Sequence, residues 1–87
     1  MRVVSILYFY AEWDSRYKER FQMAKMCHNK GVKLNFIDCE TEYGVGMSIK
    51  YGVRLCPTVL IFEDGKEVMR LNGAVANDII REKYIKK

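Results

Sequence analysis

The chain has 87 residues, enough for one small domain, and its hydrophobic content of 49% is that of a globular protein rather than a disordered one. The net charge of +4 is a mild surplus, without the dense basic stripe of a nucleic-acid-binding module. No stretch approaches the ~20 apolar residues of a membrane span. We therefore expect a single domain over residues 1–87 that is monomeric and has neither nucleic acid nor a membrane as a partner.

The first part of the chain predicts a strand, a helix and a second strand. Residues 3–10 are almost continuously apolar, which is typical of a central strand buried on both faces. Asp14 or Ser15 is a good helix N-cap, and Gly31 is a plausible left-handed cap at the helix end. Residues 32–37 alternate as a second strand, so this unit predicts parallel pairing with a right-handed crossover.

The middle of the chain is less regular. Residues 39–46 are polar and predict an irregular segment, and Val45 to Tyr51 can form a short helix that ends at Gly52. Residues 58–62, after Pro57, predict the third strand.

The end of the chain predicts a hairpin and a last helix. Asp64-Gly65 is a strong two-residue turn signal, and residues 67–71 follow as the fourth strand. Asn77 or Asp78 is expected to cap the last helix. The resulting order, βαβ, short α, ββα, gives an α/β domain with a four-stranded mixed sheet and helices on both faces.

The three cysteines, Cys27, Cys39 and Cys56, are 12 and 17 residues apart. Zinc ligands normally come in close pairs, so we expect no metal, and we expect no cofactor. Reduced thiols in a cytoplasmic protein are the simplest interpretation. Because the central strand should separate Cys39 from Cys56, we do not expect the Cα spacing of about 4.4–6.8 Å that a disulfide needs.

Several segments resemble the thioredoxin family. Ala11-Glu12-Trp13 follows the first strand, as Ala-Glu-Trp precedes the Cys-Gly-Pro-Cys of thioredoxins. Residues 50–54 (Lys-Tyr-Gly-Val-Arg) and 57–62 (Pro-Thr-Val-Leu-Ile-Phe) are similar to the run before the family's proline and the strand after it. Gly73-Ala74 matches the Gly-Ala that flanks the family's active surface. The resemblance covers about residues 3–85 and implies a thioredoxin-like fold that lacks the first strand and helix of thioredoxin.

The family's dithiol is missing from its usual place. Its two cysteines align with Asp14 and Tyr17, so dithiol exchange is not expected there. Cys56 is the remaining candidate thiol, because the resemblance implies a cis Pro57 and a position for Cys56 near Asp14 and Arg16. Arg16 would favour a thiolate and Asp14 would oppose it, so Cys56 can be either a packing residue or a reactive monothiol.

Three functions stay open. The first is a redox-inactive module that holds an extended peptide or partner protein in the cis-proline groove. That groove would be formed by Trp13, Asp14, Ser15, Arg16, Tyr17, Cys56, Pro57, Thr58, Gly73 and Ala74. The second is an atypical thiol–disulfide oxidoreductase with Cys56 as its catalytic monothiol and with glutathione or a partner cysteine as resolver. The third is a stable domain whose role the fold does not reveal.

Overall fold

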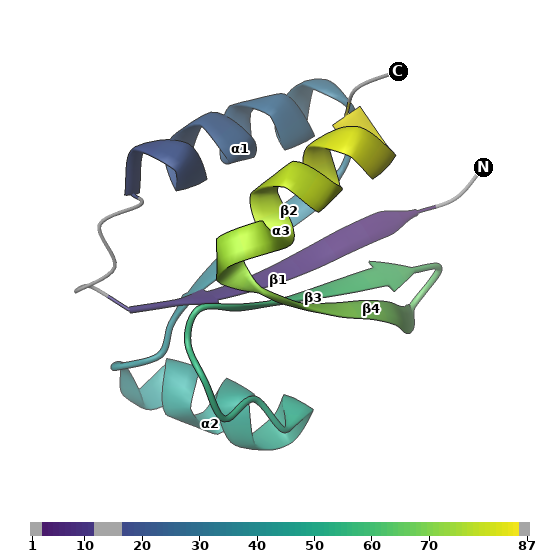
Figure 1. The fold of residues 1–87 in the computed structure, drawn as a ribbon. Helices are drawn as coiled ribbons and strands as arrows, with labels where there is room; N and C mark the ends of the chain where they lie inside the picture. Colours follow the sequence, from purple (N-terminus) through teal and green to yellow (C-terminus); the bar gives the residue numbers. More distant parts are fainter. Residues whose placement is uncertain (1–2, 12–16, 86–87) are drawn as a thin grey trace.

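The fold is seen in a computed structural model that describes residues 3–11 and 17–85, with side chains except those of 17–21 and 73–75. The elements follow in the predicted order (Figure 1): β1 (Val4–Tyr10), α1 (Tyr17–Asn29), β2 (Lys33–Asp38), α2 (Glu42–Tyr51), β3 (Thr58–Glu63), β4 (Lys66–Asn72), α3 (Gly73–Ile80) and a π-helical turn, η1 (Arg81–Ile85).

The four strands form one mixed sheet in the order β2-β1-β3-β4. β1 pairs in parallel with β2 and antiparallel with β3, and β3 pairs antiparallel with β4. The predicted α/β fold with a four-stranded mixed sheet is therefore confirmed. The parallel pair requires the crossover that α1 supplies.

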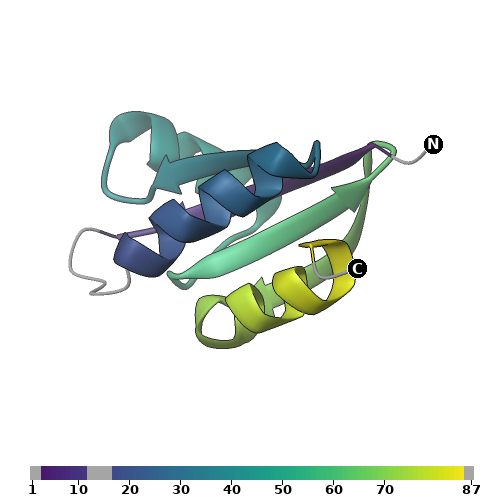
Figure 2. The same ribbon diagram turned by 90° about the horizontal axis from the view of Figure 1, so that it is seen from above.

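Helices cover both faces of the sheet. α1 and α3 lie on one face, and among the described elements α2 covers the other (Figure 1). The view from above shows α1 and α3 side by side over the strands (Figure 2). Alternate residues of the central strand β1 serve the two sides: Ile6 and Tyr8 join the cluster under α1 and α3, while Leu7 and Phe9 join the cluster under α2.

Two glycines end the first two helices in the same way. At the end of α1, Gly31 has a φ of 71°, and the N–H of Val32 donates to the carbonyl of Cys27 over 2.9 Å. At the end of α2, Gly52 has a φ of 67°, and the N–H of Val53 donates to the carbonyl of Ser48 over 2.8 Å. Both ends are Schellman caps, in which a left-handed residue satisfies the last carbonyls.

Two helix starts differ from the sequence predictions. α2 begins at Glu42 rather than Val45, because the Thr41 side chain accepts a hydrogen bond from the N–H of Gly44 over 2.9 Å and so caps the helix. α3 begins at Gly73, so the prediction that Asn77 or Asp78 caps the last helix was wrong. The predicted caps of α1, Asp14 and Ser15, lie outside the described residues.

Asn77 instead lies inside α3 and faces the core. Its side chain is buried and accepts a hydrogen bond from the buried Tyr8 hydroxyl over 3.2 Å. A buried polar group needs such a partner, so this bond ties α3 to the central strand. Within the described residues, no helix is long and apolar enough to cross a membrane.

Candidate functional site

The strand register brings two cysteines to the same end of the sheet. Tyr10, the last residue of β1, pairs with Asp38 of β2, so Cys39 is the next residue along on one side. On the other side Phe9 pairs with Thr58 of β3, which runs in the opposite direction, so Cys56 precedes the strand at the same level. Cys39 and Cys56 therefore flank the point where the chain leaves β1 at Ala11.

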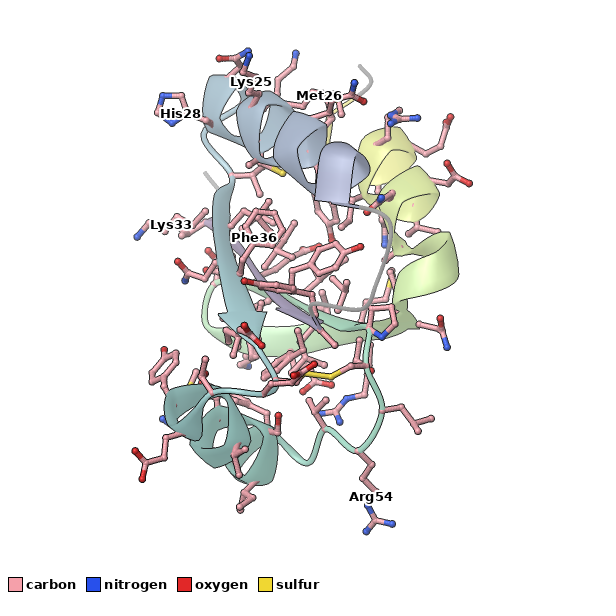
Figure 3. All side chains as sticks on the ribbon, turned by 90° about the vertical axis from the view of Figure 1, so that its left-hand side faces the viewer. Lys25, Met26, His28, Lys33, Phe36 and Arg54 are labelled. Carbon is pink, nitrogen blue, oxygen red and sulfur yellow. A yellow bond between two sulfur atoms is a disulfide. The ribbon has the colours of Figure 1, made fainter. Side chains whose placement is uncertain are left out.

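Cys39 and Cys56 are joined by a disulfide, with an S–S distance of 2.07 Å and Cα atoms 7.2 Å apart. The expectation of reduced thiols at these two positions was wrong, although the Cα spacing does lie outside the range of about 4.4–6.8 Å, as expected. Figure 3, which looks at this end of the sheet, shows the bond between the loop after β2 and the segment before β3.

The error lay in extending the strand spacing beyond the strand. Two strand spacings of about 4.8 Å would hold the flanking chains ~9.6 Å apart while β1 lies between them. β1 ends at Tyr10, however, and past that residue the flanking chains are free to converge. The backbone N–H of Cys39 still donates a hydrogen bond to the carbonyl of Tyr10 over 2.8 Å. The disulfide therefore forms immediately beyond the last paired residue of β1.

The disulfide has an apolar side and an open side. Cys39 and Cys56 both pack against the buried cluster of Leu7, Phe9, Ile37 and Leu60 beneath α2. Both cysteines are nevertheless only half-buried. Thiol–disulfide exchange needs access to a sulfur, and the incomplete burial of both residues is compatible with it.

The charges on the two sides of the disulfide differ. Cys39 lies between Asp38 and Glu40, and the Asp38 carboxylate accepts a hydrogen bond from the N–H of Glu40 over 2.9 Å, so it folds back across the Cys39 backbone. On the other side, Arg54 precedes Cys56 by two residues and points out from the loop (Figure 3). Carboxylate side chains thus stand next to Cys39 in the chain, whereas residues 54–58 around Cys56 carry none.

Arg70 of β4 fixes the chain that leads to Cys56. Its guanidinium donates to the carbonyl oxygens of Tyr51 over 2.8 Å and Gly52 over 3.1 Å, at the end of α2. The same group binds both carboxylate oxygens of Glu67 over 3.0 Å, and these hydrogen bonds hold the pKa of Glu67 below its usual value. A cation at a helix C-terminus is favourable, so Arg70 anchors one end of the loop that carries the disulfide.

The chain around Pro57 is held locally. The peptide bond between Cys56 and Pro57 is cis. The Thr58 hydroxyl donates to the carbonyl of Leu55, which closes a short turn around this bond. Because Thr58 pairs with Asn72 of β4, the start of α3 at Gly73 and Ala74 follows directly beside Pro57.

The predicted site residues are thus only partly accounted for. The structure brings Cys56, Pro57 and Thr58 to the end of the sheet where Gly73 and Ala74 begin α3. Tyr17 is the first residue of α1, and Trp13, Asp14, Ser15 and Arg16 lie outside the described residues. Cys39 was missed as a site residue, although its place directly after a strand parallel to β1 was a usable signal.

The third cysteine is a core residue. Cys27 lies on α1, is fully buried between that helix and the sheet, and is a free thiol. Burial raises the pKa of the Cys27 thiol from 9.0 to about 11, so it carries no charge near neutral pH. In the ranges 3–11 and 17–85, no cluster of three or more His, Cys, Asp or Glu side chains could hold a metal ion.

The chain is similar in sequence and fold to proteins of one family. The family model described as thioredoxin matches residues 2–87. Among solved structures, thioredoxin from Fasciola hepatica is 25% identical, with 94% of this chain and 78% of that chain covered and a TM-score of 0.73. Thioredoxin from Trypanosoma brucei brucei is 21% identical, with 93% and 71% covered and a TM-score of 0.76.

A third solved structure has the same fold. Oxidised thioredoxin O2 from Arabidopsis thaliana is 17% identical, with 94% of this chain and 76% of that chain covered and a TM-score of 0.74. These likenesses at low identity support the fold, and the family match covers nearly the whole chain. The chain belongs to the thioredoxin family.

Proposed function

We propose that this protein is a thiol–disulfide oxidoreductase in which Cys39 and Cys56 form the redox pair. The observation that carries the proposal is the Cys39–Cys56 disulfide at the end of β1, beside Pro57. A disulfide at this place favours a redox role over a redox-inactive binding module. It also replaces the external resolver expected for a lone Cys56 with a partner inside the chain.

The exchange is a two-electron reaction. A thiolate of a substrate dithiol attacks one sulfur of the Cys39–Cys56 bond, forms a mixed disulfide and releases the other sulfur as a thiolate, which takes up a proton. The second substrate thiol then attacks the mixed disulfide, so the substrate leaves oxidised and the protein holds two thiols. In the opposite direction, the reduced pair converts a substrate disulfide into two thiols.

Within this pair, Cys56 is the attacking cysteine and Cys39 the resolving one. The carboxylates of Asp38 and Glu40 on either side of Cys39 disfavour a thiolate there, whereas residues 54–58 around Cys56 carry no carboxylate. Cys56 is also next to Leu55, which is 72% exposed and offers an apolar contact to an incoming chain.

The substrate in this proposal is a protein or peptide cysteine in an extended segment. Support comes from the resemblance of residues 57–62 to the strand that follows the family's proline, and from the half-exposed Cys56 and Pro57 at its start. Backbone pairing beside such a segment requires no particular side chain of the substrate.

The test is reduction of insulin by dithiothreitol, followed by turbidity, with the chain and its Cys39→Ser and Cys56→Ser variants. We expect the native chain to exceed dithiothreitol alone and Cys56→Ser to fall to that background. In a separate incubation with oxidised glutathione and no dithiothreitol, Cys39→Ser should accumulate a mixed disulfide between Cys56 and glutathione and release one reduced glutathione, because its resolver is missing. Intact mass detects this product. Circular dichroism of each variant controls for folding. A native chain no faster than dithiothreitol alone would refute the proposal, as would a fully active Cys56→Ser variant.

A further inference from the structure

The outward face of α2 is apolar at its centre and charged at its ends. Residues at positions i, i+3, i+4, i+7 and i+8 share one side of a helix, and on α2 these are all exposed. In chain order they are Glu42, Val45, Gly46, Ile49 and Lys50. Ile49 is 78% exposed and Val45 48% exposed, and the neighbouring Tyr43 is 66% exposed.

This face is distinct from the face by which α2 packs on the sheet. Met47 and Tyr51 contact the buried cluster of Leu7, Phe9 and Leu60, and Gly44 is buried against the end of β2. Figure 1 shows that the far side of α2 points away from the sheet. A helix with one packed face normally turns charged side chains outward, so apolar side chains on both faces indicate a second packing partner.

The outward face of α2 has an acidic residue at one end and a basic residue at the other, so it is complementary to a second, antiparallel copy of itself. We propose that two copies of this chain associate through α2, with the two helices antiparallel about a two-fold axis at Gly46. A two-fold axis pairs positions whose numbers add to twice that of the axis. Glu42 therefore meets Lys50 of the second copy, and Tyr43 meets Ile49 of the second copy. One operation thus pairs the charges at both ends and brings Tyr43 to Ile49, with Val45 one residue from the axis.

Gly46 lies at the point where the two helices would cross. A Cβ at this position would have no atom within 4 Å, so the space above the glycine is open. A residue without a side chain at the crossing point lets two helix backbones approach closely. Glycine costs stability inside a helix, and Gly46 makes no internal contact that would require it.

The charges at the two ends are available for an intermolecular contact. Within the described part of the chain, neither Glu42 nor Lys50 forms an ion pair, and the ammonium of Lys50 lies 5.5 Å from the centre of its own Tyr51 ring. A monomer was expected from the sequence, in which this helix was predicted to start at Val45. Because α2 in fact begins at Glu42, the outward face of the helix has an acidic residue at its first position.

The expected dimer is weak, because a helix of ten residues is short and offers a face at the small end of protein interfaces. Sedimentation velocity of the oxidised chain, from roughly 10 µM to 1 mM, covers the range expected for such an interface. We expect a concentration-dependent rise from monomer to dimer. Ile49→Glu should abolish it, since it places charges in the apolar centre.

Charge reversal tests the antiparallel pairing. Glu42→Lys brings two lysines together at both ends of the interface, and Lys50→Glu brings two glutamates together, so each variant should dimerise at least about tenfold more weakly. Mixing the two variants in equal amounts restores opposite charges at both ends. The mixture should therefore dimerise about as well as the native chain.

A native chain that stays monomeric up to the highest concentration overturns the proposal. A dimer that survives Ile49→Glu, or a mixture that associates no better than its components, also overturns it, because the contact then lies elsewhere. Insulin reduction by the same variants separates this result from the proposed function, since Glu42, Ile49 and Lys50 lie outside the redox pair.

Discussion

The backbone N–H of Cys39 donates a hydrogen bond to the carbonyl oxygen of Tyr10 over 2.8 Å. This bond fixes the first residue after β2 to the last residue of β1, and the disulfide then joins Cys39 to Cys56. All of α2 lies in the loop that the disulfide closes. The disulfide is therefore placed both to react and to hold α2 on the sheet.

Reduction of the disulfide should lower the stability of the fold. Closing a loop over a sequence separation of 17 residues restricts the unfolded chain and corresponds to about 3 kcal/mol in the chain-entropy description. We expect the free energy of unfolding in urea to fall by about 2–3 kcal/mol when dithiothreitol is added. The double variant Cys39→Ala with Cys56→Ala is the control, because dithiothreitol should not change its stability. Equal stability of the native chain with and without reductant would contradict the structural role.

Alanine substitutions at the two glycines inside α2 should have opposite effects on the stability of the fold. A Cβ on Gly44 would lie 1.7 Å from the carbonyl oxygen of Asp38, so Gly44→Ala must displace α2 from the end of β2. We expect a loss of about 1–3 kcal/mol. Gly46→Ala meets no neighbour and should instead gain about 0.5–1 kcal/mol from helix propensity. Urea unfolding at low micromolar protein measures both, and two variants of equal stability would show that α2 does not pack as described.

The Cys27 thiol should not react with alkylating reagents in the native protein. Its thiol is fully buried with a pKa of about 11, whereas Cys39 and Cys56 are only partly buried. Iodoacetamide at pH 8 should therefore add two groups to the reduced native chain and three to the chain in urea, counted by mass spectrometry. A third rapid modification under native conditions would place Cys27 at the surface.

The same thiol predicts a pH dependence at the alkaline end. Because the folded pKa of Cys27 is raised above its ordinary 9.0, the folded chain keeps a proton that the unfolded chain loses. The protonated Cys27 thiol therefore makes its full contribution to the free energy of unfolding below about pH 9. This contribution is lost as the pH rises toward about 11. A Cys27→Ala variant should show a flatter decline of unfolding free energy over this window, and an unchanged decline would count against the burial of the thiol.

The buried hydrogen bond between Tyr8 and Asn77 should contribute to stability. Tyr8→Phe keeps the ring in the core and removes the hydroxyl that donates to Asn77 over 3.2 Å. We expect a loss of about 1 kcal/mol, because the Asn77 oxygen loses a partner in a buried place. Tyr43→Phe, at a side chain that is 66% exposed, is the comparison and should cost less. A Tyr8→Phe variant as stable as the native chain would mean that the bond has no net value.

The fold could be predicted because independent local signals agreed. The apolar run of β1, the glycines that end α1 and α2, and the Asp64-Gly65 turn each predicted an element on its own. Asp64 and Gly65 indeed both have positive φ, 53° and 84°, as a two-residue hairpin turn of this kind requires. These signals are short-range, so one sequence is enough to find them.

The site was harder to predict because its decisive contact is long-range. Cys39 and Cys56 approach each other only through the pairing of β2 and β3 with the same strand, and the convergence past Tyr10 is a property of the loops. The start of α2 was missed for a related reason. The hydroxyl of Thr41 caps the helix while also donating to the carbonyl of Asp38 over 2.8 Å, so the cap depends on where β2 ends.

The most direct test of the redox pair is its midpoint potential. The native chain would be equilibrated in dithiothreitol or glutathione redox buffers, quenched with a thiol-specific reagent, and the fraction with Cys39 and Cys56 reduced read by mass spectrometry. A functional pair should titrate reversibly as one two-electron transition with a midpoint above about −300 mV, in the range of thioredoxin-type oxidoreductases. A midpoint well below about −300 mV, or thiols that fail to re-form the bond, would make the disulfide a purely structural link and contradict the proposed function.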